Sequence, residues 1–413
     1  MSKCLQKQFH KGVRMENKLT QEHYVLFSPQ NILILTMVLF FGFTSLRFGA
    51  FGLGELLLLF FCLNELVGKK KILVSFHHHF FSLFWVAFLC FMTFGYAVNT
   101  FLGIAPQDVK FDYQAYVVIL FLCFTFETFL KKSNFASLYS LVRFLYFGGL
   151  FVIGTLFFIY LRGRTVLLGF SLTYGGADIF SPFANDYHQF AYFIAPFPFI
   201  GLYIMTIEKQ MTVKILALAG IVLSVFIGLS TTSSTLVAAW AIATLIFCIV
   251  MTVKSVHKLH RSYGLIIALF CILLLVLLFN SELILIFIND FFHGDTNGEN
   301  RLVIWSNAIK AWLYSPIFGL GPGSYSGDDV FDGYEAHNSF LQILTQGGIA
   351  GGLAYILMVT KLTKNTYVNT FILCSVISLI VYGFGINDLR RTVLWFYYIL
   401  FYFLVLKSKG ETS

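Results

Sequence analysis

Apolar residues dominate the chain in long runs, which short polar segments separate. Runs of about 17–25 residues recur from Ile32 to Leu406, and a helix of this length crosses the hydrocarbon core of a bilayer. We therefore expect an all-α polytopic membrane protein with about 12 transmembrane helices. They are predicted at 32–46, 51–67, 72–98, 115–130, 136–160, 187–207, 213–228, 235–253, 264–288, 340–360, 367–386 and 393–406.

The composition supports the same fold class. Of the 413 residues, 58% are hydrophobic and 12% are charged, whereas a soluble domain has about 45–50% apolar and about 25% charged residues. This composition leaves no room for a large separate soluble domain. None of the seven cysteines forms a CxxC pair, so neither a zinc site nor a disulfide framework is indicated.

The distribution of Lys and Arg predicts the topology. An even number of spans puts both termini on one side, and about 20 of the 28 basic residues then fall on that side. Both termini are therefore expected in the cytoplasm. Topology accounts for the net charge of +8, so no nucleic-acid partner is indicated.

The predicted organisation has five parts. A basic N-terminal segment without a signal-peptide cleavage site should be cytoplasmic. One outside segment, about fifty residues long, is expected to be a partly helical, catalytic extracytoplasmic loop, because loops of that length are usually functional or disordered. The parts are a cytoplasmic segment at 1–29, helices 1–9 at 30–288, the loop at 289–338, helices 10–12 at 339–407 and a cytoplasmic tail at 408–413.

Five arginines lie in segments predicted to be outside, against the general trend. Arginine offers a planar fork that binds phosphate oxygens in pairs and stays charged. These side chains could hold a diphosphate at the membrane surface. The alternative is that they anchor the protein to lipid headgroups. The five are Arg162, Arg164, Arg301, Arg390 and Arg391.

The long outside loop carries a recognisable pattern. Residues 300–313 are predicted to form a helix, because Arg301, Trp305 and Ala308 recur at spacings of three and four. A Gly-rich segment at 319–323, interpreted as a tight turn, and a His-Asn pair follow. The loop and the next span read "ENRLVIWSNAIKAWLYSPIFGLGPGSY" and then "AHNSFLQILTQGGIAGGLAYI".

This combination resembles the O-antigen ligase and polymerase superfamily. The resemblance implies a metal-independent glycosyltransferase without a cofactor, in the bacterial cytoplasmic (inner) membrane. Its donor would be an oligosaccharide linked to undecaprenyl diphosphate, transferred at the outer face of that membrane. The products would be capsule, exopolysaccharide or O-antigen. Beside this substrate and the lipid bilayer, other membrane proteins of polysaccharide assembly are candidate partners.

The resemblance also suggests roles for single residues. Arg301 matches the loop arginine of the family, and His337 matches the histidine where a catalytic base is usually placed. Arg164 matches an arginine of the earlier outer loop, for which Arg162 competes. Asn185 matches the polar residue that opens the following span.

One stretch departs from the family pattern. Many members have Ser-Arg-Gly at the start of the span after the tight outside hairpin, whereas this chain has only Ser and Thr at 230–235. A phosphate-binding charge has either moved, with Arg162 and Arg390 as candidates, or is not needed.

Further candidates come from the residues themselves. His titrates nearest physiological pH, so His337 could deprotonate a sugar hydroxyl. Asp186 and His188 open the sixth span and are second-tier site candidates. Polar residues recur every four positions after His337, and sugar contacts and helix–helix hydrogen bonds remain equally open for them. The substrate-binding candidates on this side of the loop are Tyr325, Asn338 and Gln342, with Gln346 continuing the stripe.

A group of acidic residues precedes the His-Asn pair. Asp328, Asp329, Asp332 and Glu335 are interpreted as a solvated loop, with calcium or a cationic sugar as the alternative, because their spacing fits no cation-binding loop.

Three functions remain open at this point. A polymerase that joins lipid-linked repeat units is the first choice, and a ligase that moves the same donor to another acceptor is the second. A lipid-linked oligosaccharide flippase is the alternative of another class. Transporters usually show related halves or broken helices, and no clear internal repeat is present.

Overall fold

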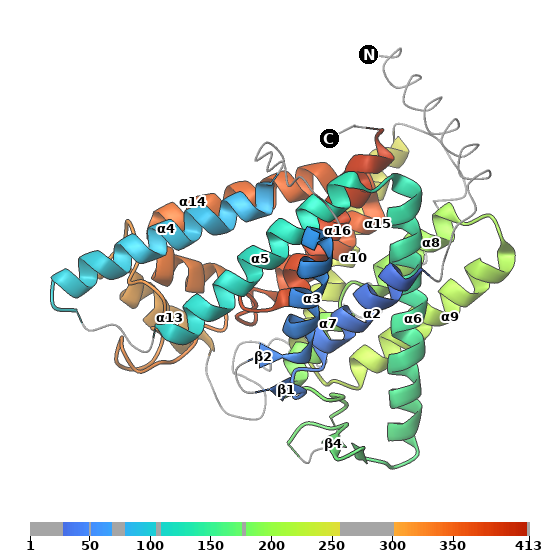
Figure 1. Ribbon diagram of the computed structural model, residues 1–413, viewed down its shortest axis with the longest axis horizontal. Coiled ribbons are helices and arrows are strands. Elements are labelled where there is room, and N and C mark those ends of the chain that lie inside the picture. Colours follow the sequence, from blue (N-terminus) through green and yellow to red (C-terminus); the bar gives the residue numbers. More distant parts are fainter. Residues whose placement is uncertain are drawn as a thin grey trace.

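The computed structural model describes residues 28–48, 51–67, 79–104, 109–175, 179–256 and 301–410. Within them the chain is almost entirely helical, and the strands form only two short antiparallel hairpins (Figure 1). The hairpins are β1 (Arg47–Phe48) with β2 (Phe51–Gly52), and β3 (Val166–Leu167) with β4 (Phe170–Ser171). The first helices are α2 (Pro29–Gly42), α3 (Leu53–Val67), α4 (Phe80–Phe101), α5 (Lys110–Lys132), α6 (Phe135–Leu161), α7 (Tyr187–Ile194) and α8 (Phe197–Ile207). The remaining ones are α9 (Met211–Leu229), α10 (Ser234–Val256), α13 (Arg301–Trp312), α14 (Ser339–Thr366), α15 (Thr370–Tyr382) and α16 (Thr392–Ser408).

The helices agree with a polytopic membrane protein. Among the described residues, seven segments are long and apolar enough to cross a bilayer, and four shorter helices are also apolar. The predicted span at 264–288 and the first part of the outside loop, 289–300, lie outside the described residues. The number of twelve spans is therefore not tested. The predicted helix at 300–313 is confirmed as α13.

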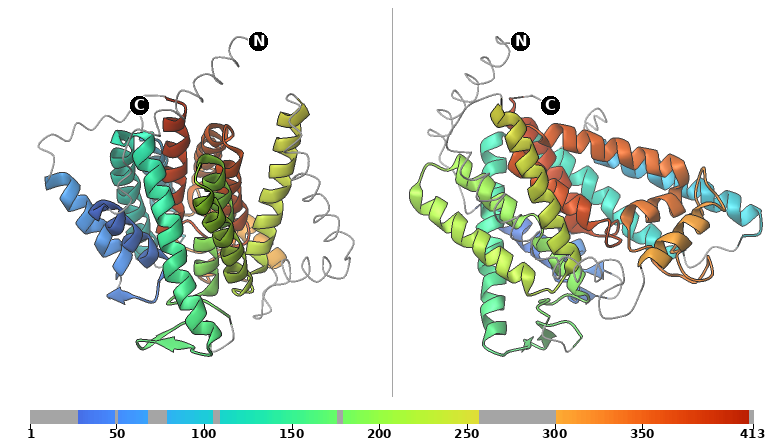
Figure 2. Two further views of the ribbon diagram at one scale, coloured as in Figure 1. Left: turned by 90° about the vertical axis from the view of Figure 1, so that its right-hand side faces the viewer. Right: turned by 180° about the vertical axis from the view of Figure 1, so that it is seen from behind.

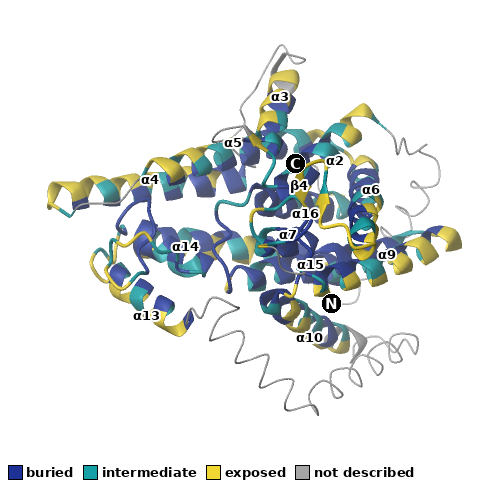
Figure 3. Cartoon of the chain, turned by 90° about the horizontal axis from the view of Figure 1, so that it is seen from below, coloured by how far each residue is buried: buried dark blue, intermediate teal, exposed yellow. Residues whose placement is uncertain are grey.

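Helix α16 lies at the centre of the bundle. Of its 17 residues, 13 are buried, which agrees with a sequence that is apolar on all sides. Trp85 of α4 packs edge-on against Trp395 of α16, at 4.7 Å between ring centroids. Seen from below, α16 and α7 are dark blue in the interior, while the outward sides of α9, α10 and α13 are yellow (Figure 3).

Two of the apolar spans are broken helices. The span 187–207 breaks between α7 and α8, and the carbonyl of Ala195 there accepts hydrogen bonds from Trp240 Nε1 at 2.8 Å and Ser378 Oγ at 3.4 Å. Helix α14 breaks at Gly348, whose φ of +61° and ψ of −163° are not helical. Such breaks are tolerated in membranes where neighbouring groups satisfy the freed backbone.

The helix ends form two opposite faces. Both hairpins lie at one of them, which we call the hairpin face, and the C-terminal end of α16 lies at the other (Figure 2). Backbone hydrogen bonds join the segments of the hairpin face, including Ser45 N to Phe183 O (2.8 Å) and Phe180 N to Ser230 O (2.9 Å). The opposite face holds the Arg143–Glu208 ion pair at 2.9 Å. The segment predicted outside at 161–186 thus belongs to the hairpin face.

Candidate functional site

The Gly-rich loop segment fills the break in α14. The N–H groups of Leu320 and Gly321 donate to the carbonyls of Thr345 and Gln346, at 2.7 and 3.1 Å. Beyond the break, Ile349 N donates to Pro316 O at 2.8 Å, and Ala350 N bonds Ile317 O at 3.2 Å. A tight turn was expected at 319–323, and the structure adds that residues 316–321 supply the hydrogen bonds that α14 has lost.

Glycine is required at this junction for steric reasons. A Cβ on Gly348 would lie 2.2 Å from the carbonyl oxygen of Ile317, and one on Gly319 would lie 2.4 Å from the backbone of Gln346. Both residues also have positive φ, which side-chain-bearing residues rarely adopt. The atoms that these Cβ atoms would meet belong to the backbone, which cannot move aside as a flexible side chain can. The position of the loop relative to α14 is therefore fixed.

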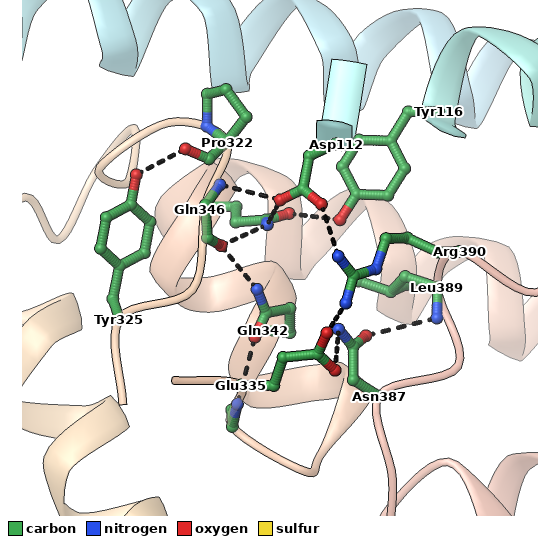
Figure 4. Close-up of polar contacts among 12 residues, drawn as sticks. Asp112, Tyr116, Pro322, Tyr325, Glu335, Gln342, Gln346, Asn387, Leu389 and Arg390 are labelled. Carbon is green, nitrogen blue, oxygen red and sulfur yellow. Dashed lines mark hydrogen bonds and ion pairs between the residues drawn. The ribbon is translucent and has the colours of Figure 1, made fainter. Parts of the chain in front are cut away.

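Asp112, in the first turn of α5, joins this loop to the helices. Its carboxylate accepts hydrogen bonds from Gly323 N at 2.8 Å and from Gln346 Nε2 at 2.7 Å, and its other oxygen lies 3.1 Å from Arg390 Nη1 (Figure 4). The residue is only 4% exposed. A buried carboxylate is stable when it is paired and hydrogen-bonded in this way.

The polar stripe of α14 is buried behind Asp112. Gln342 Nε2 and Gln346 Nε2 each donate to Gly323 O at 2.7 Å, and Gln346 accepts from Tyr116 OH at 2.7 Å (Figure 4). Tyr325 is fully buried and donates to Pro322 O at 2.6 Å. In this structure the side chains of Gln342 and Tyr325 are buried and hydrogen-bonded to the loop, so they act as positioning residues.

Arg390 forks between two carboxylates that lie far apart in the sequence. One nitrogen pairs with Asp112, and the other pairs with Glu335. Asn387 also donates to Glu335, at 3.2 Å, and the ring of Phe111 lies under the guanidinium at 5.0 Å. The interpretation of Glu335 as part of a solvated acidic loop is therefore wrong, because this residue pairs with a half-buried arginine.

A cavity of about 340 Å³ opens beside this ion pair, between α2, α3, α5, α7 and the segment before α16. Its lining combines an apolar part with a strongly polar part. The apolar part includes Phe40, Phe41, Phe111, Ala115 and Val118. The polar part includes Thr44, Arg47, Glu55, Gln114, Asn185, Gln189, Glu335, Arg390, Arg391 and Thr392.

Arg391 also lines the cavity, and the side chain of Gln189 fixes its guanidinium. With the Gln189 amide oxygen turned toward it, that oxygen accepts hydrogen bonds from both terminal guanidinium nitrogens, at 2.9 and 3.1 Å. Burial, and after it the neighbouring Arg390, lower the pKa of Arg391 from 12.5 to about 10, although Asp186 and Asp388 oppose this shift. The side chain stays charged near neutral pH.

The candidates at the start of the sixth span occupy two places. Asn185 lines the cavity, and its Nδ2 donates to Thr44 O at 3.0 Å. Asp186 caps α7 by accepting from His188 N at 2.9 Å, as expected for a helix N-cap. His188 does not line the cavity, and its Nδ1 lies 3.2 Å from Tyr382 OH.

His337 lies directly before α14 in a strained conformation. Its φ is +45°, and its ring contacts Tyr334 at 5.8 Å between centroids. Asn338 caps α14 by accepting from Phe340 N at 3.0 Å and Leu341 N at 3.1 Å. Non-glycine residues rarely have positive φ, and such strain clusters at functional sites.

Asp388 links this helix start to the arginines. Its carboxylate is buried and accepts from Ser339 Oγ, and Ser339 Oγ accepts from Asp388 N at 2.9 Å. Ser339 N also bonds Gly383 O at 2.8 Å. The segment between α15 and α16 therefore holds both the His337-Asn338 turn and the arginine pair, which places them on one scaffold.

Arg301 lies beside the Ser/Thr stretch at 230–235. It is 6% exposed, and its Nη2 lies 3.5 Å from Thr235 Oγ1, at the start of α10. A cation from α13 thus reaches the Ser/Thr stretch that has no arginine of its own. A Cβ on Gly385 would lie 2.5 Å from Thr235 Cγ2, so this contact borders the same α15–α16 segment.

The structure does not bring the two arginines of the earlier loop to the cavity. Arg162 and Arg164 are exposed at the end of α6, where Arg162 covers the Phe158 ring at 5.0 Å. Neither lines the cavity. Of the two candidates for a relocated phosphate-binding charge, Arg390 is the one that the fold directs into it.

Sequence reasoning missed several residues of the site. Asp112, Gln189 and Arg47 were not selected, and Arg391 was noted only as one arginine of an outside group. A carboxylate two residues after Lys110, at the entrance of an apolar span, was the available signal for Asp112.

The cavity can bind an amphipathic anion. Its arginines suit paired phosphate oxygens, its amides suit hydroxyl groups, and its phenylalanines suit a hydrocarbon chain.

Comparison with known proteins gives one family match, and Glu335 is the residue of the cavity lining that lies in the matched segment. Residues 218–356 match the model of the O-antigen ligase family, a segment that contains α10, α13 and most of α14. A search of curated proteins finds no match to the chain.

Proposed function

On the premise that the chain belongs to the O-antigen ligase and polymerase superfamily, we propose that it is a polymerase of a surface polysaccharide. It joins repeat units carried on undecaprenyl diphosphate, at the outer face of the bacterial cytoplasmic membrane and without a metal. The observation that carries this proposal is the amphipathic cavity that Arg390 and Arg391 line directly before α16.

The donor fits the two parts of the cavity lining. Its diphosphate lies against Arg390, Arg391 and Arg47, and its polyprenyl chain leaves past Phe40 and Phe111 toward the membrane. The arginine forks match phosphate oxygens in pairs. Because the site is partly withdrawn from water, each charge–charge attraction is stronger than at an open surface.

The reaction needs a base and a cationic leaving-group site. A hydroxyl of the acceptor sugar attacks the anomeric carbon of the donor chain, with inversion, and loses its proton to His337. The bond between that carbon and the diphosphate oxygen breaks, and the lipid diphosphate leaves with the bonding electrons. Arg390 and Arg391 stabilise the negative charge that develops on it. Arg301 does not line the cavity and contacts Thr235 at the start of α10.

A ligase uses the same donor and differs only in the acceptor. The cavity describes the donor site alone, so the acceptor decides between the two functions. A flippase is favoured less, although α14 and the span 187–207 are broken. The freed backbone groups of both breaks are hydrogen-bonded inside the protein at 316–321 and at Trp240 and Ser378, and do not line a transport path.

Lipid-linked intermediates of a deletion strain test the proposal. Loss of a polymerase leaves single repeat units that face outward, and loss of a flippase leaves them facing the cytoplasm. Loss of a ligase leaves polymer of normal length on the lipid carrier. Reporter fusions provide a second test, because a cytoplasmic location of 313–338 would contradict the proposed site.

A further inference from the structure

The ion pair between Arg390 and Glu335 differs from the one between Arg390 and Asp112 in how firmly it is held. The Asp112 side chain is 5% exposed and also accepts from Gly323 N and Gln346. The Glu335 side chain is 32% exposed, lines the cavity, and also accepts a hydrogen bond from Asn387 (Figure 4). Arg390 thus has one fixed and one accessible carboxylate.

We propose that Glu335 is a displaceable counter-ion, which occupies Arg390 until the donor diphosphate replaces it. This inference rests on the proposed function, since it concerns the same cavity. Glu335 is a positioning residue here, acting through Arg390. It would have no role in bond formation.

Charge and geometry both favour the exchange. A carboxylate carries one negative charge, whereas a diphosphate carries more charge and offers oxygens to Arg390 and Arg391 together. Glu335 is already partly exposed and regains water when it is released, so its loss of Arg390 costs little. Asp112 stays in place and keeps its bond to the Arg390 guanidinium (Figure 4).

The exchange also gives selectivity. With Glu335 bound, a singly charged lipid headgroup must displace a carboxylate of equal charge and gains little from doing so. A diphosphate gains a second arginine. The pair Arg390–Glu335 therefore keeps the site closed to the abundant monophosphate lipids of the bilayer while it admits the donor.

The test is the binding of inorganic pyrophosphate, the probe for the diphosphate group, to the full-length protein in nanodiscs of zwitterionic lipid. Glu335→Gln and Glu335→Ala are compared with the wild type. Glu208→Gln is the matched control, because Glu208 pairs with Arg143 at the opposite face. We expect pyrophosphate to bind about three- to tenfold more tightly to both Glu335 variants and unchanged to Glu208→Gln.

Two further measurements exclude a merely structural role. In an Arg390→Gln background, Glu335→Gln should give no gain, because the two changes act through one contact. With the lipid-linked donor, Glu335→Gln should lower KM without raising kcat, since donor and product are held alike. Thermal unfolding of each variant confirms that it is folded.

The outcomes separate the two claims. If pyrophosphate binds the wild type but binds both Glu335 variants equally or more weakly, the proposal that Glu335 is a counter-ion is overturned. The proposal that the cavity binds a diphosphate then still stands. If neither the wild type nor the variants bind pyrophosphate, both proposals are overturned, the diphosphate site in the cavity and the counter-ion role of Glu335.

Discussion

The guanidinium of Arg390 lies 3.1 Å from the carboxylate of Asp112, and 278 residues separate the two in the sequence. This pair joins the start of α5 to the segment before α16 and, through Gly323, to the Gly-rich loop. The cationic cavity, the loop and the break in α14 are therefore parts of one hydrogen-bonded structure.

Asp112→Asn should destabilise the protein and reduce polymer synthesis strongly. The amide can still accept from Gly323, but it leaves Arg390 without its fixed partner, and breaking a buried pair costs about 3 kcal/mol. Thermal unfolding in detergent and polymer assays measure the two effects. Asp328→Asn, at an exposed position of the same loop, should behave as wild type, and an equal effect of both changes would contradict the role of Asp112.

Gly348→Ala should be among the most damaging single substitutions in α14. The new methyl group would lie 2.2 Å from the carbonyl of Ile317, in a backbone conformation with φ +61°, and we expect a loss of several kcal/mol. Gly103→Ala is the control, because Gly103 also has positive φ but meets no atom within 4 Å. Equal melting temperatures for the two variants would show that the loop does not seal the break.

His337→Asn tests the proposed base more cleanly than His337→Ala. Asparagine tolerates positive φ, as His337 requires at +45°, but it cannot take a proton near neutral pH. We expect unchanged protein level and a loss of polymer synthesis of about 100-fold or more, the usual size of a general-base contribution. Near-normal synthesis by the Asn variant would remove His337 from the mechanism.

Asp388 should make stability depend on pH. Burial raises the pKa of Asp388 from 3.8 to about 7, so the folded protein holds this proton more tightly than the unfolded chain. Stability from this group is therefore complete below about pH 4 and is lost as pH rises through about 7, by up to about 4 kcal/mol. Between pH 5 and 8, the melting temperature of the wild type should fall relative to that of Asp388→Asn. If the melting temperatures of the two proteins change in parallel with pH, the raised pKa of Asp388 is contradicted.

Local patterns predicted the helices well. The spans expected at 136–160 and 213–228 correspond to α6 and α9, since length and apolarity decide where a chain crosses a bilayer. The break at Gly348 was not predicted, because a Gly-rich stretch on a helix also suits close packing. Gly347 and Gly351 do pack that way, against Phe88 of α4.

The site was predictable only in part. An excess of outside arginines indicated an anion site, but which of them meet depends on contacts between distant segments. Arg164 and Arg390 look alike in sequence, and the fold leaves the first exposed while directing the second into the cavity. Glu335 resembled its acidic neighbours, and its partner Arg390 could not be inferred from spacing.

The central claim is that the arginines before α16 hold the donor diphosphate during polymerisation. Purified protein incubated with defined undecaprenyl-diphosphate repeat units, followed by sizing of the product, tests it directly. The wild type and Arg164→Gln should yield a ladder of polymer, and Arg391→Gln should yield single units only. A full ladder from Arg391→Gln would contradict the account.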